Sequence, residues 1–165
     1  MISVCIATYN GARYIRQQLD SIMCQLSPDD EVIVSDDGST DDTLDIVRSF
    51  RDGRIRIVRN SGGGGFVRNF ENALNHSQGD YIFLSDQDDV WFPDKVRRCM
   101  EVLERCILLN HNSILTDGEG NPSGVDFFSV HHSKGGFWQT VIRNSYSGCC
   151  MAFRRELLKK ALPFP

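Results

Sequence analysis

Short apolar runs alternate with helix-period patterns over the first 109 residues of the chain. Four of these runs are rich in β-branched and apolar residues and do not alternate with polar ones, which is typical of strands covered on both faces. The runs are Ser3–Thr8, Val32–Ser35, Ile55–Arg59 and Tyr81–Ser85. The pattern therefore predicts four buried strands with other elements between them.

The segments between these runs carry apolar residues at helical spacing. The three stripes comprise Ile15, Leu19, Ile22, Met23 and Leu26; then Phe66, Phe70, Ala73 and Leu74; then Val96, Cys99, Met100, Leu103, Cys106 and Ile107. A shorter helix over Asp41–Phe50 is indicated by Ser39, which is followed three residues later by Asp42, the spacing of a capping box. Alternation of strand and helix predicts an α/β fold with a mainly parallel central sheet flanked by helices.

The pattern loosens after Asn110, where shorter elements are expected. They are a strand at Ser113–Thr116, a turn at Asp117–Asn121, a helix at Gly136–Arg143, a strand at Ser147–Phe153 and a last helix at Arg154–Ala161. His131 and His132 fall in a predicted loop with no metal-ligand partner nearby, which favours surface histidines. No repeat or linker divides the chain, so residues 1–165 are expected to form a single domain.

Composition narrows the class of protein. The net charge of -4 argues against broad binding to nucleic acid. No apolar run approaches the roughly 18–20 residues that span a bilayer, and no basic segment precedes the first strand. These features predict a cytoplasmic protein, and peripheral contact with a membrane stays open. The six cysteines form no CxxC pair and are expected to be buried or half-buried free thiols.

Candidate chemistry lies directly after the predicted strands, because ligands of parallel α/β sheets bind at the carboxyl ends of the strands. The segment Asp86-Gln87-Asp88-Asp89 follows the fourth strand. Its carboxylates repel one another by about 1 kcal/mol per close pair near a surface. A divalent cation would relieve this repulsion, and Mg²⁺ or Mn²⁺ takes carboxylate oxygens together with substrate phosphates. The alternative is a solvated acidic turn that caps the next helix.

Two other strand ends carry polar residues. In Asp36-Asp37-Gly38-Ser39, one carboxylate could accept hydrogen bonds from a base or a ribose, or the segment could be a turn with a helix cap. In Thr8-Tyr9-Asn10-Gly11, a hydroxyl, a ring and a glycine suit close approach to a planar base, or Asn10 could be a helix N-cap. Both alternatives stay open at this point.

A glycine run at Gly62–Gly65 precedes the second helical stripe. Free amides at the start of a helix attract anions, but the Gly-Lys-Ser or Gly-Lys-Thr of a phosphate loop is absent. Arg68 and Asn69, one turn into this helix, are the better candidates for contact with a phosphate or nucleotide.

Three motifs in this order together resemble glycosyltransferase family 2, whose members have the Rossmann-like GT-A fold. They are Ser3–Gly11, Val34–Thr43 and Gly79–Trp91. The segment Ser-Asp-Gln-Asp-Asp-Val-Trp, with Pro93-Asp94-Lys95 after it, is similar to bacterial rhamnosyltransferase-like members that decorate cell-surface polysaccharides. The resemblance implies metal-assisted, inverting transfer of a sugar from a nucleoside diphosphate to an acceptor hydroxyl.

The resemblance also implies roles for particular residues. Asp88 and Asp86 would ligate Mg²⁺ or Mn²⁺ on the diphosphate. The implied nucleotide-binding residues are Thr8, Tyr9, Asn10, Asp36, Asp37, Arg68 and Asp86. The stretch Asn144–Phe153 is similar to the acceptor-side strand of the family, so residues 1–109 would form the nucleotide-sugar half and residues 110–165 the start of the acceptor-side half.

The expected donor is a UDP- or dTDP-linked sugar, and the expected acceptor is a carbohydrate or a lipid-linked one at the inner face of the cytoplasmic membrane. The catalytic base of the family lies downstream of the positions that match this chain. No base is therefore assigned within residues 1–165, and the chain is expected to be a shortened form. A module that binds nucleotide sugar without turnover is the alternative.

Overall fold

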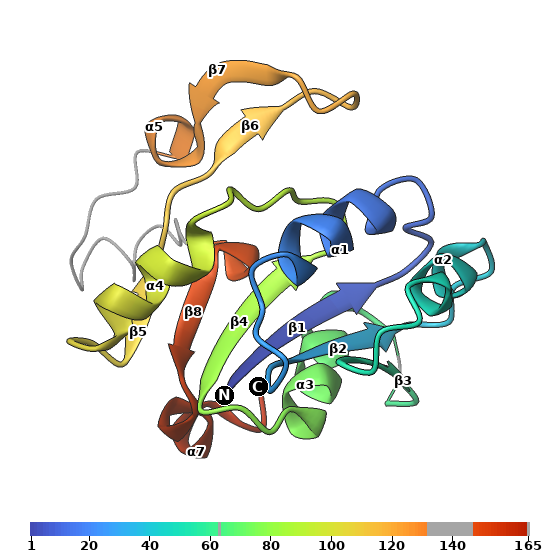
Figure 1. The fold of residues 1–165 in the computed structure, drawn as a ribbon, viewed down its shortest axis with the longest axis horizontal. Helices are drawn as coiled ribbons and strands as arrows, with labels where there is room; N and C mark the ends of the chain where they lie inside the picture. The colour runs from blue at the N-terminus through green and yellow to red at the C-terminus, as the bar shows by residue number, and fades with distance from the viewer. Residues whose placement is uncertain (63, 132–146, 165) are drawn as a thin grey trace.

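The computed structural model describes residues 1–62, 64–131 and 147–164, and its centre is a six-stranded sheet (Figure 1). The strand order is β3-β2-β1-β4-β8-β5. Strands β1 to β4 pair in parallel, and β8 runs antiparallel to both β4 and β5. The bounds are β1 Ile2–Thr8, β2 Glu31–Asp36, β3 Ile55–Arg59, β4 Tyr81–Asp86, β5 Leu108–Asn110 and β8 Met151–Arg154. The expected α/β fold with a mainly parallel sheet is confirmed.

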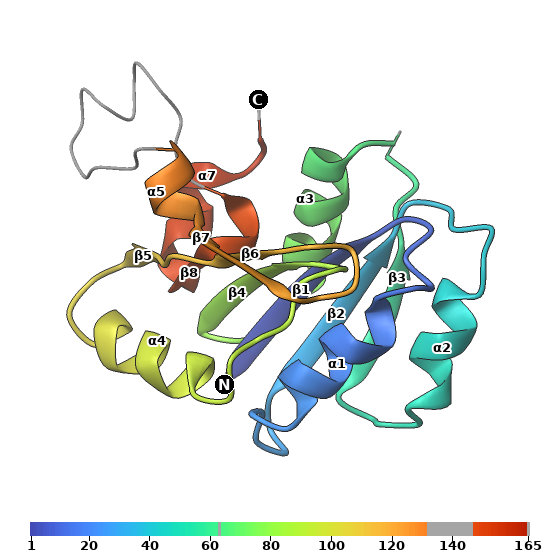
Figure 2. The same ribbon diagram turned by 90° about the horizontal axis from the view of Figure 1, so that it is seen from above.

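Helices cover both faces of this sheet (Figure 2). On one face lie α1 (Ile15–Met23), α2 (Thr43–Ser49) and α4 (Lys95–Leu103), whose apolar side chains share one core cluster with the strands. On the other face lie α3 (Phe66–His76) and, near the end of the chain, α7 (Leu158–Ala161). Strand side chains point alternately to the two faces, so Val4 and Ile6 join the first core and Cys5 joins the second. Burial on both faces explains the unbroken apolar runs.

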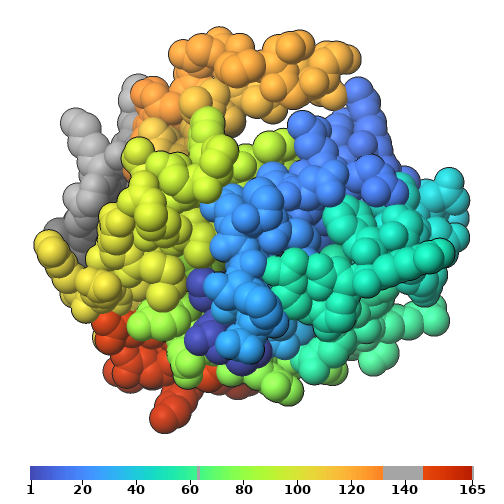
Figure 3. Space-filling view, viewed as in Figure 1, coloured from blue at the N-terminus to red at the C-terminus, as the bar shows by residue number. Residues whose placement is uncertain are grey.

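A β-hairpin lies beyond the carboxyl end of the parallel strands, across the top of the space-filling view in Figure 3. It consists of β6 (Ile114–Thr116) and β7 (Pro122–Asp126) and is followed by the short helix α5 (Phe127–His131). The expected turn at 117–121 is present, because the Asp117 amide donates to the Asn121 carbonyl at 3.0 Å. At the tip, Arg13 Nη2 donates to the Gly118 carbonyl at 2.8 Å. This bond ties the hairpin to the loop after β1.

The structure corrects the prediction of a capping box before α2. Asp42 is the N-cap residue, and no side-chain cap bond forms there. The Ser39 hydroxyl instead donates to Asp36 Oδ1 at 2.5 Å. Spacing alone could not show this, because a serine two or three residues after an aspartate also suits a side-chain turn.

The later elements were predicted less well. A 3₁₀ turn (Gly148–Cys150) replaces the start of the expected strand at 147–153, and a second one (Arg155–Leu157) replaces the start of the expected last helix. His131 ends α5 and does not lie in a loop. Strands β5 and β7 and helix α5 were missed, because three to five residues give too little periodicity to read. The predicted helix at 136–143 and His132 lie outside the described residues.

All six cysteines are free thiols, as expected. Five of them are buried or half-buried, but Cys24 is exposed, and the expectation of burial was wrong for this residue. Within the described part of the chain, none of the helices has both the length and the apolar character needed to cross a membrane.

Candidate functional site

The loop after β2 is organised by the buried carboxylate of Asp36. Its Oδ2 accepts hydrogen bonds from the amides of Gly38 and Ser39, each at 3.0 Å. Its Oδ1 accepts from the Ser39 hydroxyl, and Thr8 Oγ1 lies 3.3 Å away. A carboxylate offers about four acceptor positions, so these four donors occupy it in this conformation. Gly38 has a φ of +88°, which the turn requires and a side chain would disfavour.

Asp37 lies at the junction of three segments and has acceptor capacity left. Its Oδ1 accepts from Asn60 Nδ2 at 2.9 Å, and its Oδ2 accepts from the Gly65 amide at 2.8 Å. Its own amide donates to the Thr8 carbonyl at 2.9 Å. Asp37 therefore joins the ends of β1, β2 and β3 to the start of α3, and of the two adjacent aspartates it is the one with oxygens free for a ligand.

Asn10 joins the loop after β1 to the loop after β2 and does not cap α1. Its amide donates to Ser39 Oγ at 2.9 Å, and its Oδ1 accepts from the Thr40 amide at 2.8 Å. Its φ of +48° lies in the left-handed region, which asparagine tolerates better than most residues. The N-cap position of α1 belongs to Tyr14, without a side-chain cap bond.

Gln87 joins the acidic segment to the loop after β1, a role that the sequence did not indicate. Its Oε1 accepts from the Tyr9 amide at 2.9 Å, and its Nε2 donates to the Tyr9 carbonyl at 3.1 Å. Gly11 allows this approach, since a Cβ there would lie 2.3 Å from Gln87 Oε1. The Tyr9 side chain is 57% exposed, so Gln87 fixes the backbone of a residue whose ring is free to meet a ligand.

Replacing Gln87 by alanine is expected to weaken binding of a nucleoside diphosphate about 10-fold, because the two hydrogen bonds that position Tyr9 each contribute about 0.5–1.5 kcal/mol. Gln87→Glu, which can accept but not donate, should lie between wild type and alanine. Isothermal calorimetry measures the effect, with Gln78→Ala as the matched control, because Gln78 is exposed at the opposite end of β4. Equal affinities for Gln87→Ala and Gln78→Ala would contradict the role given to Gln87.

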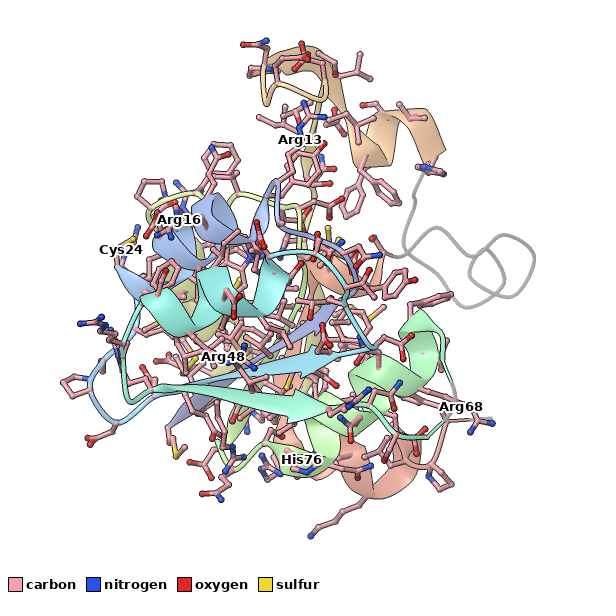
Figure 4. The ribbon with its side chains drawn as sticks, turned by 90° about the vertical axis from the view of Figure 1, so that its right-hand side faces the viewer. Arg13, Arg16, Cys24, Arg48, Arg68 and His76 are labelled. Atoms are coloured by element: carbon pink, nitrogen blue, oxygen red, sulfur yellow. The ribbon has the colours of Figure 1, made fainter. Side chains whose placement is uncertain are left out.

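Arg68 lies apart from the other candidates. It is in the first turn of α3, and its Nη1 donates to the Gly62 carbonyl at 2.7 Å. In Figure 4 its side chain points away from the sheet. Together with Phe66 and Phe164 it lines a groove of about 430 Å³ beside the glycine run. The structure therefore brings Thr8, Tyr9, Asn10, Asp36 and Asp37 together and leaves Arg68 at the edge.

The acidic segment after β4 forms a compact group with a cysteine from far along the chain. Ligand atoms of Asp86, Asp89 and Cys149 all lie within 4.8 Å of one another. Burial raises the pKa of the Asp86 carboxyl, and the nearby charge of Asp88 acts in the same direction. Burial and the Asp86 charge raise the pKa of Asp89 to about 6, although Lys95 opposes this shift. Asp88 itself is exposed and is not a member of this group.

These residues fit a divalent cation. Two partly buried carboxylates lie within 4.8 Å of each other and of one thiol, and a cation would stabilise their ionised forms. Carboxylate oxygens suit Mg²⁺ and Mn²⁺. The sequence predicted that the carboxylates of this segment gather around a cation, with Asp86 and Asp88 as ligands and Asp89 in support of the site. It missed Cys149, since residue 149 is brought in only by the antiparallel pairing of β8 with β4.

Comparison with known proteins identifies relatives over nearly the whole chain. Residues 3–162 match the family model of Glycosyl transferase family 2. The chain is 30% identical to an uncharacterized glycosyltransferase of Nostoc, over 98% of this chain and 53% of the relative. It is 32% identical to the putative teichuronic acid biosynthesis glycosyltransferase TuaG of Bacillus subtilis, over 90% of this chain and 60% of the relative. It is 36% identical to the dTDP-rhamnosyl transferase RfbG of Shigella flexneri, over 64% of this chain and 38% of the relative. The chain thus spans about half the length of these relatives.

Solved glycosyltransferase structures share its fold. A mannosyltransferase from Pyrobaculum calidifontis in complex with GDP-Man and Mn²⁺ matches with a TM-score of 0.73 and 25% identity, over 99% of this chain and 47% of that protein. Glucosyl-3-phosphoglycerate synthase from Mycobacterium tuberculosis, in complex with Mn²⁺, UDP and phosphoglyceric acid, matches with a TM-score of 0.66 and 25% identity. The match covers 96% of this chain and 57% of that protein. The GT-A fold expected from the motifs is confirmed.

Proposed function

Because this chain belongs to glycosyl transferase family 2, we propose that it provides the nucleotide-sugar site of an enzyme that transfers a sugar from a nucleoside diphosphate to an acceptor hydroxyl. The observation that carries the proposal is the meeting of three segments at one sheet edge. The acidic segment after β4 is hydrogen-bonded through Gln87 to the loop after β1, and that loop is bonded to the loop after β2. Three of the strand ends expected to bind ligand are thus joined.

The loops after β1 and β2 are proposed to hold the nucleoside. The exposed ring of Tyr9 can stack on a base, and the open oxygens of Asp37 can accept hydrogen bonds from a base or a ribose. Asp36 and Thr8 would contribute to nucleoside binding by holding the loop after β2 in shape. The relatives support a nucleotide donor, since their names or complexes include dTDP-rhamnose transfer, GDP-Man and UDP. A UDP- or dTDP-linked sugar is the proposed donor.

Asp86 and Asp88 are proposed to hold Mg²⁺ or Mn²⁺ at the diphosphate. When bound, the cation would neutralise charge on the leaving diphosphate as a Lewis acid. Asp88 is exposed, so its carboxylate can turn toward a ligand. The proposed reaction is a single displacement with inversion at the sugar carbon, and none of the described residues is assigned as its general base.

The acceptor is proposed to be a carbohydrate or a lipid-linked precursor of a cell-surface polysaccharide. The teichuronic acid biosynthesis named for TuaG supports this class of acceptor. A lipid-linked acceptor would place the reaction in the cytoplasm at the inner face of the membrane, reached by peripheral contact.

A thermal-shift panel tests the donor site, with UDP, dTDP and GDP each added with and without Mn²⁺. UDP or dTDP is expected to raise the melting temperature only with Mn²⁺, because the proposed cation holds the diphosphate to the carboxylates. A ligand at 100 times its Kd stabilises the folded state by about 2.7 kcal/mol, which sets the size of the expected shift. No shift with any diphosphate and Mn²⁺ would contradict the proposal. Donor hydrolysis or transfer in the same preparation would indicate an enzyme, whereas binding without turnover would indicate a binding module.

A further inference from the structure

Helix α1 and the turn after it carry a stripe of polar side chains that bind the acidic segment. The stripe consists of Gln18, Ser21 and Gln25, whose spacing of three and four residues places them on one side of a helix. Ser21 Oγ accepts from the Trp91 amide at 3.0 Å, and Gln25 Nε2 donates to the Phe92 carbonyl at 3.0 Å. These bonds fix the part of the segment that follows its carboxylates.

Gln18 makes the corresponding contact just before the carboxylates. Its side chain is fully buried, and its Nε2 donates a hydrogen bond to Ser85 Oγ. Ser85 Oγ in turn donates to the Asp86 carbonyl at 3.1 Å. A hydroxyl has one hydrogen and two acceptor positions, so the bond from Gln18 occupies an acceptor position and leaves the hydrogen for Asp86. The backbone at Asp86 is thus linked to α1 through Ser85.

Packing alone gives no reason for an amide at position 18. The buried neighbours of Gln18 on α1 are Ile15, Leu19 and Ile22, and an apolar residue at position 18 would extend their stripe. Gln18 Oε1 is buried and has no hydrogen-bond partner in the described part of the chain. An unpaired buried amide oxygen lowers the stability of the folded state. The contribution that remains for Gln18 is its bond to Ser85.

We propose that Gln18 is a positioning residue of the donor site, which, together with Ser21 and Gln25, holds the carboxylates of Asp86 and Asp88 in place for a ligand. Gln18 touches no ligand itself and acts through the backbone at the end of β4. Helix α1 begins directly after the loop that follows β1, so one helix connects the proposed nucleoside loop with the acidic segment. The proposal rests on the proposed function for what the carboxylates bind.

Amide hydrogen exchange of the free protein tests the positioning, with Gln18→Met as the variant. Methionine has a similar length and adapts to irregular space, but it cannot donate to Ser85. The amides of residues 86–89 are expected to exchange about 3–10-fold faster, the factor that one ordinary hydrogen bond contributes, while those of β2 and β3 keep their rates. The melting temperature should not fall, because the variant also removes the unpaired oxygen. Gln17→Met, at an exposed position of α1, is the matched control.

Titration of Mn²⁺ at saturating UDP, followed by calorimetry, tests the consequence for the donor site. The Mn²⁺ concentration at half-saturation is expected to rise about 10-fold in Gln18→Met, the lower end of the range for changes outside the ligand set. The ratio of UDP to GDP affinity should stay the same, because the loops after β1 and β2 are not altered. Ser85→Ala should weaken Mn²⁺ binding as well, and the double variant should be no weaker than Ser85→Ala, since both changes remove the same link.

Wild-type exchange at residues 86–89 in Gln18→Met, or a wild-type requirement for Mn²⁺, would overturn the proposal. Faster exchange over the whole sheet with a lower melting temperature would also overturn it, because Gln18 would then support the core and not the segment. If wild type binds UDP with Mn²⁺ in these cases, the proposed function stands and only the role of Gln18 fails. If wild type binds no nucleotide with Mn²⁺, the proposed function fails, and hydrogen exchange still decides whether Gln18 positions the segment.

Discussion

Alanine in place of Asp88 is expected to abolish the Mn²⁺-dependent part of nucleoside diphosphate binding and to leave the fold intact. Asp88 is exposed, and no hydrogen bond joins its side chain to the rest of the described chain, so its removal costs the folded state no hydrogen bond. Its proposed role at the cation is lost with the carboxylate. Affinity with Mn²⁺ should fall by at least about 100-fold, since outer-shell changes alone cost 10–100-fold at metal sites. Calorimetry with UDP and dTDP, with and without Mn²⁺, measures this loss.

Asp20→Ala is the matched control for Asp88→Ala, because Asp20 is an exposed aspartate on α1, distant in sequence from the acidic segment. Both variants should melt at the wild-type temperature, and only Asp88→Ala should lose the dependence on Mn²⁺. Unchanged Mn²⁺-dependent binding in Asp88→Ala would remove Asp88 from the ligand set. The carboxylates of Asp86 and Asp89 would then be the ones that hold the ion.

The parallel part of the sheet could be predicted because its strands are buried on both faces. The runs Val32–Ser35 and Tyr81–Ser85 are apolar except for the serine at the end of each, and all their residues but the half-buried Tyr81 are buried. The structure extends the first by one residue at each end and the second by one residue at its carboxyl end. The helical stripes were clear in their middle parts, since Leu19 and Leu103 are fully buried. Their ends were wrong: Phe66 is 77% exposed, and Ile107 lies beyond the end of α4. A run of four or more apolar residues, or an apolar stripe along a helix, buries a large area when the chain folds, so the element it predicts is well determined.

The later strands β5 and β8 could not be predicted in the same way. Strand β5 has three residues and pairs with β8 across more than 40 positions, so its existence depends on tertiary contact. The turn before β8 was read as strand because the apolar residues Cys149 and Cys150 continue the pattern of Met151–Arg154. Short elements with few buried residues carry little sequence signal.

The position of the candidate site was predictable, but the bonds within it were not. The rule that ligands meet strand ends brought Tyr9, Asp37 and Asp86 to one edge of the sheet. The hydrogen bonds between Gln87 and the Tyr9 backbone join residues 78 positions apart, and the spacing of a glutamine between two aspartates does not indicate them. Asp36 carried the same signal as Asp37, yet its oxygens are engaged by Ser39 and Gly38.

Trp91 connects the acidic segment to the hydrophobic core. It is only 4% exposed, and its ring centroid lies 5.7 Å from that of Phe83 on β4. Its amide donates to Ser21 Oγ at 3.0 Å, which fixes the segment against α1. On its other side, Lys95 Nζ lies 3.9 Å from the ring centroid, and Lys95 is also close enough to Asp89 to oppose the rise in the pKa of that carboxyl. The indole therefore sets where Asp89 and Lys95 lie.

Replacing Trp91 by alanine is expected to reduce the free energy of unfolding by about 3–5 kcal/mol, the range for truncating a buried aromatic side chain. The same change should weaken Mn²⁺ binding, because Asp89 loses the anchor two residues after it. Trp91→Phe is the matched variant: the indole Nε1 has no hydrogen-bond partner among the described residues, so phenylalanine gives up volume and no bond. It should cost about 1–2 kcal/mol and keep most Mn²⁺ affinity.

Urea unfolding and Mn²⁺ calorimetry on the two Trp91 variants separate packing from anchoring. If the urea midpoint of Trp91→Ala equals that of wild type, the ring does not stabilise the core, contrary to what its burial indicates. If Trp91→Ala is destabilised while its Mn²⁺ affinity equals that of Trp91→Phe, the segment holds its shape through Gln87 and Tyr9 instead. The expected order of Mn²⁺ affinity is wild type, then phenylalanine, then alanine, because the cation centre can be no more rigid than the core contact that positions Asp89.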